Sequence, residues 1–211
     1  MLSLASTAFG VIITPSSRND GYFHNEIGTA YDFFDSDDTE IGPSYFKVMT
    51  TGTEVTQRNA FMQFDISSLT EVAGKCSLNL YIISSTFDSA SSAGTIRVST
   101  NSSAANGNAS QQITGDVTIH TMPSGYSGWL SLDVTSYVTN AFNNGYDYMA
   151  FSFNCATEYD YYTSSGFSFY SADSSINKPY LNVPEPSTYA AIAGAGALGL
   201  AFLRRRRKAV L

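Results

Sequence analysis

The chain has 211 residues, of which 43% are hydrophobic and only 14% are charged, and its formal net charge is −7. Five of its 11 basic residues form a block from Arg204 to Lys208, so residues 1–203 carry 6 basic and 18 acidic groups, a net charge of −12. An acidic body without a basic face argues against nucleic-acid binding, because contacts to phosphates supply most of that affinity.

The first 13 residues allow two interpretations. They are apolar like the core of a secretory signal, although a basic n-region and a clear small-x-small cleavage site are missing. Alternatively, Phe9–Thr14 forms the first strand of the domain, because Val11-Ile12-Ile13 is β-branched and Pro15-Ser16-Ser17 ends the run. We favour the strand, in which case the export signal lies upstream of the sequence.

A cluster of carboxylates follows, and it is the best metal candidate in the chain. Several carboxylates in one flexible loop can supply the oxygen ligands that Ca²⁺ prefers, although their order does not fit an EF-hand loop. Two interpretations stay open: these side chains are only solvated, which is usual for clustered surface carboxylates, or they bind a structural calcium ion. The acidic residues are Asp32, Asp35, Asp37, Asp38 and Glu40.

Short apolar runs separated by Ser-, Gly- and Asn-rich turns continue to about Val183. Apolar and polar residues alternate within them, which predicts half-buried strands. The one helical pattern is Val134–Asn144, which Asp133 opens as a predicted N-cap. This pattern predicts an all-β fold over residues 11–183, a jelly-roll type β-sandwich with one short helix. The predicted strands are Tyr45–Met49, Asn59–Asp65, Ser77–Ser84, Thr95–Ser99, Asp116–His120, Gly128–Asp133, Tyr148–Asn154, Gly166–Tyr170 and Tyr180–Val183.

Three kinds of residue allow structural predictions within this domain. We expect Asp65 to cap a turn through its side chain. Trp129 is expected in the core rather than as a platform for a sugar ring, because tryptophan is highly buried on average. Cys76 and Cys155 either form one disulfide in an oxidising compartment or are two small buried apolar residues.

Three segments of the domain form a recognisable series: Arg58-Asn59-Ala60-Phe61-Met62-Gln63-Phe64-Asp65-Ile66-Ser67-Ser68-Leu69, Gly128-Trp129-Leu130-Ser131-Leu132-Asp133-Val134-Thr135, and the ending from Phe169 to Leu181. In this order they resemble segments of DNRLRE-type domains. The resemblance covers about residues 11–183 and implies a β-sandwich akin to carbohydrate-binding modules. Asp173 stands where that family has a glutamate.

The C-terminal 28 residues consist of a Pro-Glu-Pro motif, the uncharged segment Tyr189–Leu203 and the basic block. These three parts resemble a PEP-CTERM sorting signal. The resemblance implies an exported protein of a Gram-negative bacterium, first anchored in the inner membrane. It also implies that an exosortase-type membrane peptidase removes the tail, and that the protein associates with exopolysaccharide and biofilm matrix. The motif is Pro184, Glu185 and Pro186, and the basic residues are Arg204, Arg205, Arg206, Arg207 and Lys208.

The physical chemistry of this tail (184–211) agrees with a removable anchor. Each proline disfavours helix at the residue before it, which keeps the motif extended for a peptidase. As a single transmembrane helix, the 15 residues from Tyr189 to Leu203 would span about 22 Å. This is less than the hydrocarbon thickness of about 30 Å. The arginines would hold the C-terminus in the cytoplasm and leave residues 1–188 outside.

A catalytic site is not evident, because no nucleophile elbow is present and neither His24 nor His120 has a nucleophile nearby in sequence. Tyr159, Tyr161 and Tyr162 either stack on sugar rings or line one face of a strand edge. The leading hypothesis is a non-enzymatic envelope or matrix protein whose sandwich binds polysaccharide. The alternatives are a polysaccharide-degrading or -modifying enzyme and a purely structural surface protein.

Overall fold

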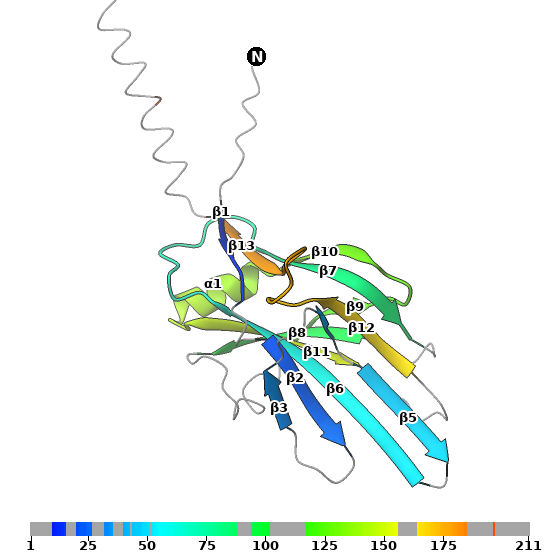
Figure 1. Ribbon diagram of the computed structural model, residues 1–211. Coiled ribbons are helices and arrows are strands. Elements are labelled where there is room, and N and C mark those ends of the chain that lie inside the picture. Colours follow the sequence, from blue (N-terminus) through cyan, green and yellow to red (C-terminus); the bar gives the residue numbers. More distant parts are fainter. Residues whose placement is uncertain are drawn as a thin grey trace, which may run out of the picture.

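A computed structural model describes residues 10–15, 20–26, 32–35, 40–42, 44–50, 52–87, 94–101, 117–155, 164–184 and 196. These residues form an all-β fold of curled antiparallel sheet with one short helix (Figure 1). The elements are β1 (Gly10–Ile13), β2 (Asp20–Glu26), β3 (Asp32–Asp35), β4 (Glu40–Ile41), β5 (Ser44–Thr50), β6 (Gly52–Asp65), β7 (Ser77–Thr86), β8 (Gly94–Asn101), β9 (Val117–Met122), β10 (Gly128–Asp133), α1 (Thr135–Asn143), β11 (Tyr148–Cys155), β12 (Ser164–Tyr170) and β13 (Tyr180–Pro184).

Two layers of strands face each other, as the jelly-roll type prediction requires (Figure 1). In the first layer, β7 pairs with β10 along one edge and with β13 and β12 along the other, and β1 pairs with β13. In the second, β6 pairs with β2 and β11, and β8 and β9 continue from β11. β5 pairs with both β6 and β12, so it joins the two layers into one curled sheet.

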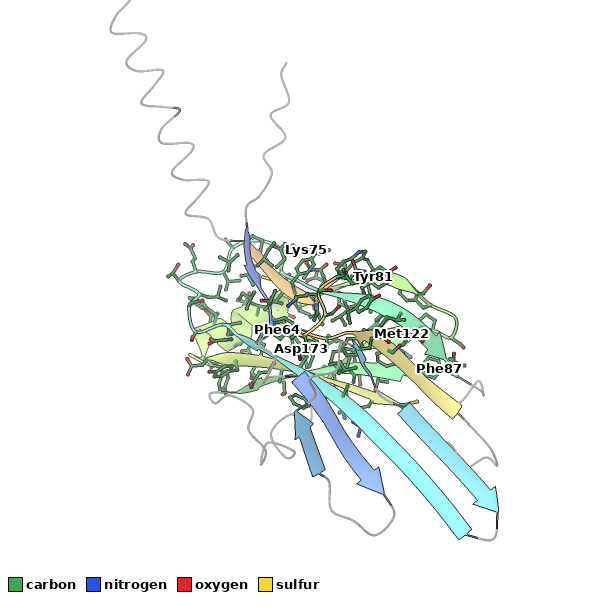
Figure 2. The ribbon with its side chains drawn as sticks, viewed as in Figure 1. Phe64, Lys75, Tyr81, Phe87, Met122 and Asp173 are labelled. Atoms are coloured by element: carbon green, nitrogen blue, oxygen red, sulfur yellow. The ribbon has the colours of Figure 1, made fainter. Side chains whose placement is uncertain are left out.

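The core lies between the layers and follows from the alternation of the strands. Leu78, Leu80 and Ile82 of β7 are fully buried, as are Met62 and Phe64 of β6. Figure 2 shows Phe64 between the layers, whereas Lys75 and Tyr81 lie on the side of the β7 layer that faces away from β6. Because side chains alternate along a strand, the residues between the buried positions of β7 must point outward.

The first strand is confirmed over Gly10–Ile13, where Val11 is the partner of Val183. Three strands, β2, β3 and β4, were not expected from the sequence. The prediction that the acidic cluster lies in one loop is wrong for residues 32–35, because their backbone pairs with β2 as strand β3. Glu40 begins β4, opposite Tyr170. Pairing with neighbouring strands supplies these segments with backbone hydrogen bonds, which do not depend on an alternation of apolar and polar residues.

Two predicted side-chain caps are resolved differently. Asp65 caps its turn as expected, since its Oδ1 accepts hydrogen bonds from the amide of Ser67 (3.0 Å) and from its hydroxyl (2.6 Å). The predicted N-cap at Asp133 is wrong by one residue, because Val134 occupies that position without a side-chain bond. Asp133 Oδ1 instead accepts from Thr135 Oγ1 (2.6 Å) and Thr135 N (3.1 Å), and these bonds lower the pKa of Asp133.

Candidate functional site

Four aromatic side chains gather on the outer side of the first layer, and we call this surface the aromatic face. Trp129 comes from β10, Tyr81 from β7, Tyr170 from β12 and Tyr180 from β13. In β7 the even positions from Leu78 to Ile82 fill the core, so Tyr81 is directed outward. The strand pairing then places residues that are distant in sequence side by side.

The four rings of the aromatic face are in contact. Trp129 lies directly opposite Tyr81 in the β10–β7 ladder, and their ring centroids are 5.5 Å apart at an interplanar angle of 89°. The Trp129 and Tyr180 centroids are 5.8 Å apart, and those of Tyr81 and Tyr170 are 5.7 Å apart. The two edge-to-face contacts of Trp129 and the tilted contact between Tyr81 and Tyr170 hold each ring in place, while part of its surface stays accessible to a ligand.

Trp129 is 47% exposed, so the expectation that it lies in the core is wrong. Its neighbour Leu130 is buried and Leu132 packs against the core, which leaves Trp129, Ser131 and Asp133 on the outer face. The alternation of Gly128-Trp129-Leu130-Ser131-Leu132-Asp133 carried this signal in the sequence. The average burial of tryptophan was a weaker guide than this local period of two.

Amide and hydroxyl side chains occupy nearby positions on the strands that carry the rings, and Asn79 among them is largely buried. Asn79 lies opposite both Ser131 and Tyr180 in the ladders of β7, and its Nδ2 donates to the carbonyl (3.1 Å) and hydroxyl (3.0 Å) oxygens of Ser77. Further along β7, the hydroxyl oxygens of Ser84 and Ser168 are 3.2 Å apart. Ligand sites commonly combine an aromatic or apolar surface with a small number of polar groups that fix the orientation of the ligand.

The backbone beneath Trp129 is held by a neighbouring side chain, and one ion pair borders the face. Tyr126 donates its hydroxyl hydrogen to the carbonyl oxygen of Trp129 across 2.6 Å. Lys75 Nζ and Asp133 Oδ2 are 3.5 Å apart, with both side chains more than half exposed. Such an exposed pair contributes little to stability, but it partly balances the charge at this border.

Most residues that the sequence proposed for binding lie outside the described part of the chain. They are Tyr159, Tyr161, Tyr162, Asp37, Asp38, Glu185, Pro186 and Arg204–Lys208. Of the calcium candidates, Asp35 ends β3 and Glu40 begins β4. The described residues contain no group of three or more potential metal-binding side chains, and the calcium site stays a prediction.

The two cysteines do not form the disulfide that was one of their two interpretations. Cys76 immediately precedes β7. Cys155 pairs with Gly94, which lies near the other end of β7, because a Cβ on Gly94 would be 2.8 Å from the ring of Phe87, the residue that follows this strand. A ten-residue strand is ~30 Å long, and a disulfide needs Cα atoms within about 7 Å. Burial raises the pKa of both thiols to about 11, as expected for buried structural cysteines.

The first proline of the predicted sorting motif belongs to the sandwich. Pro184 is the last residue of β13 and lies opposite Gly10 of β1, while the amide of Ala73 donates to the Pro184 carbonyl oxygen across 3.0 Å. Of the predicted membrane segment Tyr189–Leu203, the structure describes only Gly196, which is helical. Among the described residues, no helix has the length and hydropathy needed to cross a bilayer.

Comparisons with known proteins give two family matches. The model of carbohydrate-binding module family 96 matches residues 37–185, which is more than half of the chain. The PEP-CTERM protein-sorting motif matches residues 182–207, so the two matches overlap at the end of β13. No curated protein matches the chain.

Proposed function

The chain belongs to carbohydrate-binding module family 96 and carries a PEP-CTERM sorting motif, and from this we propose that it is an exported protein that binds polysaccharide through its aromatic face. We assign binding to this surface because Trp129 is 47% exposed and lies in a cluster with three tyrosines. The apolar C–H faces of a sugar ring pack on aromatic rings, and its hydroxyl groups bond to amides and hydroxyls beside them. The aromatic face supplies the rings, and the exposed hydroxyl group of Ser131 lies on the same side of β10 as Trp129.

The tail directs the protein before the domain acts. Its sorting motif indicates an exported, membrane-anchored precursor that is processed to the cell surface. We assign the processing to an exosortase-type peptidase of a Gram-negative envelope that recognises Pro184, Glu185 and Pro186. The mature domain would then bind exopolysaccharide or another component of the matrix.

Binding without catalysis agrees with the family, which is one of binding modules rather than enzymes. The enzyme alternative makes a separate prediction, because a hydrolase or lyase releases reducing ends or unsaturated products from its polysaccharide. A structural protein without a glycan ligand would bind none of the glycans tested. These three outcomes separate the competing functions.

Titration with polysaccharides tests the proposal through the single tryptophan of the chain. The full chain in a mild detergent is titrated with a panel of neutral and acidic polysaccharides, and tryptophan emission is recorded. Because Trp129 is half exposed, a sugar that covers its ring should shift the emission to shorter wavelength and protect the ring from acrylamide quenching. Binding measured by affinity electrophoresis without any change in the emission would contradict this site.

The calcium prediction is tested by melting. Adding Ca²⁺ at constant ionic strength should raise Tm, because a ligand that binds only the folded state stabilises it. The carboxylates of Asp35, Asp37, Asp38 and Glu40 are the proposed ligands, so Asp37→Ala should abolish the increase. Equal Tm values with and without Ca²⁺ would show that these carboxylates are only solvated.

A further inference from the structure

The sorting motif begins inside the folded domain. Its family match starts at Asn182, and residues 182–184 are strand residues of β13. Each of them pairs with β1, since Asn182 lies opposite Ile12, Val183 opposite Val11 and Pro184 opposite Gly10. The first three residues of the matched motif are therefore occupied by the fold.

A second segment holds the same end of β13. The Pro184 carbonyl oxygen accepts the Ala73 amide hydrogen, with the nitrogen and oxygen 3.0 Å apart. The next residue, Gly74, has a positive φ of 89°, and a Cβ there would lie 3.6 Å from Pro184 Cβ. Val183 is fully buried. Pro184 is thus held by β1 and by the segment Ala73–Gly74.

A peptidase commonly binds its substrate as an added strand, through the same backbone groups that a sheet uses. Backbone groups of residues 182–184 that bond to β1 and Ala73 cannot bond to the enzyme at the same time. We propose that β1 and Ala73 form a latch on the sorting motif, and that this end of β13 must open before the sorting peptidase can process the chain.

The length of the connecting chain supports the latch. Only four residues separate Pro184 from Tyr189, where the apolar segment begins, and the five Cα-to-Cα steps between them reach at most ~17 Å when fully extended. As long as β13 stays paired up to Pro184, little free chain therefore lies between the domain and the membrane. Opening the pairs that Val183 and Pro184 make with β1 would release two more residues, while Asn182 is also paired with Ser77 of β7. β1 has four residues and Ile12 is 64% exposed, and a short exposed edge strand opens more readily than a core strand.

A reversible disulfide between β1 and β13 tests the latch without changing any residue of the matched motif. Ile13 and Leu181 are directly opposite residues of β1 and β13, so Ile13→Cys/Leu181→Cys can join the strands by a disulfide. In membranes of a bacterium that has an exosortase-type peptidase, the oxidised full-length chain should stay uncleaved. Reduction with dithiothreitol should restore cleavage, and the intact mass of the chain shows whether it has been cleaved. Leu181→Cys alone is the control for the oxidant and for the lost side chain.

A second variant loosens the latch. Ala73→Pro removes the amide that bonds to Pro184, and we expect cleavage to become about two- to tenfold faster, the effect of losing one hydrogen bond. Ala73→Gly keeps the donor and is its control. Equal cleavage rates of the oxidised and the reduced Ile13→Cys/Leu181→Cys variant would overturn the latch alone. Since the latch rests on the proposed sorting, an uncleaved wild-type chain would overturn both.

Discussion

Replacing Trp129 with alanine is expected to weaken polysaccharide binding by about ten- to a hundredfold, or ~1.4–3 kcal/mol. The indole is the largest ring on the aromatic face, and it is 47% exposed to a ligand while Tyr81 and Tyr180 support its edges. Its removal takes away the stacking surface and leaves the tyrosines with less lateral support. Affinity electrophoresis in gels that contain the bound polysaccharide measures the loss.

Two further variants make this expectation specific. Trp129→Phe keeps a smaller ring, so its affinity should lie between those of the wild type and Trp129→Ala. Tyr146→Ala removes a ring that is also exposed, 37%, but belongs to the segment after α1, and it should bind like the wild type. Wild-type affinity of Trp129→Ala would exclude the aromatic face as the binding site.

The largest effect on stability is expected from Phe153→Ala, which should lower the free energy of unfolding by ~3–5 kcal/mol. Phe153 lies in β11 and is fully buried. Its ring centroid is 4.3 Å from that of Phe169 and 6.3 Å from that of Phe167, both in β12. The truncation therefore opens a cavity where the two layers meet, directly beneath the strand that carries Tyr170.

Urea unfolding of the full chain in mild detergent, followed by circular dichroism, measures this change. Ile176→Ala is the control, because Ile176 is 56% exposed and its truncation should change stability by no more than about 0.5 kcal/mol. A loss below about 1 kcal/mol for Phe153→Ala would mean that the packing between β11 and β12 is not a main source of stability. A loss within the expected range would confirm that the packing between β11 and β12 is a main source of stability.

Local patterns in the sequence were sufficient to predict the class of fold and the destination of the protein. Alternation such as that of Leu78, Leu80 and Ile82 predicted strands, because burial of one sheet face imposes a period of two. The tail was recognisable for a similar reason. Its motif, apolar segment and basic block act through composition and order along the chain, and their recognition requires no long-range contact.

The strands β2, β3 and β4 and the position of Asp133 relative to α1 were not predicted correctly. Strand pairing stabilises residues 32–35 through backbone bonds, which depend on neighbours rather than on their own side chains. Asp133 supplies the expected bond to the start of α1 from one residue earlier. Single-residue boundaries of this kind depend on backbone geometry that composition does not specify.

Only the tertiary structure decided where the candidate site lies. Trp129, Tyr81, Tyr170 and Tyr180 come from four different strands, and pairing around β7 brings their rings into contact. Strand pairing also places Cys155 opposite Gly94 of β8, away from Cys76 at the start of β7, and holds Pro184 against β1. The sequence by itself determined that the chain is an acidic β-sandwich with a sorting tail, because those properties are local. The position of the aromatic face and of the latch depends on contacts between distant segments, which exist only in the folded chain.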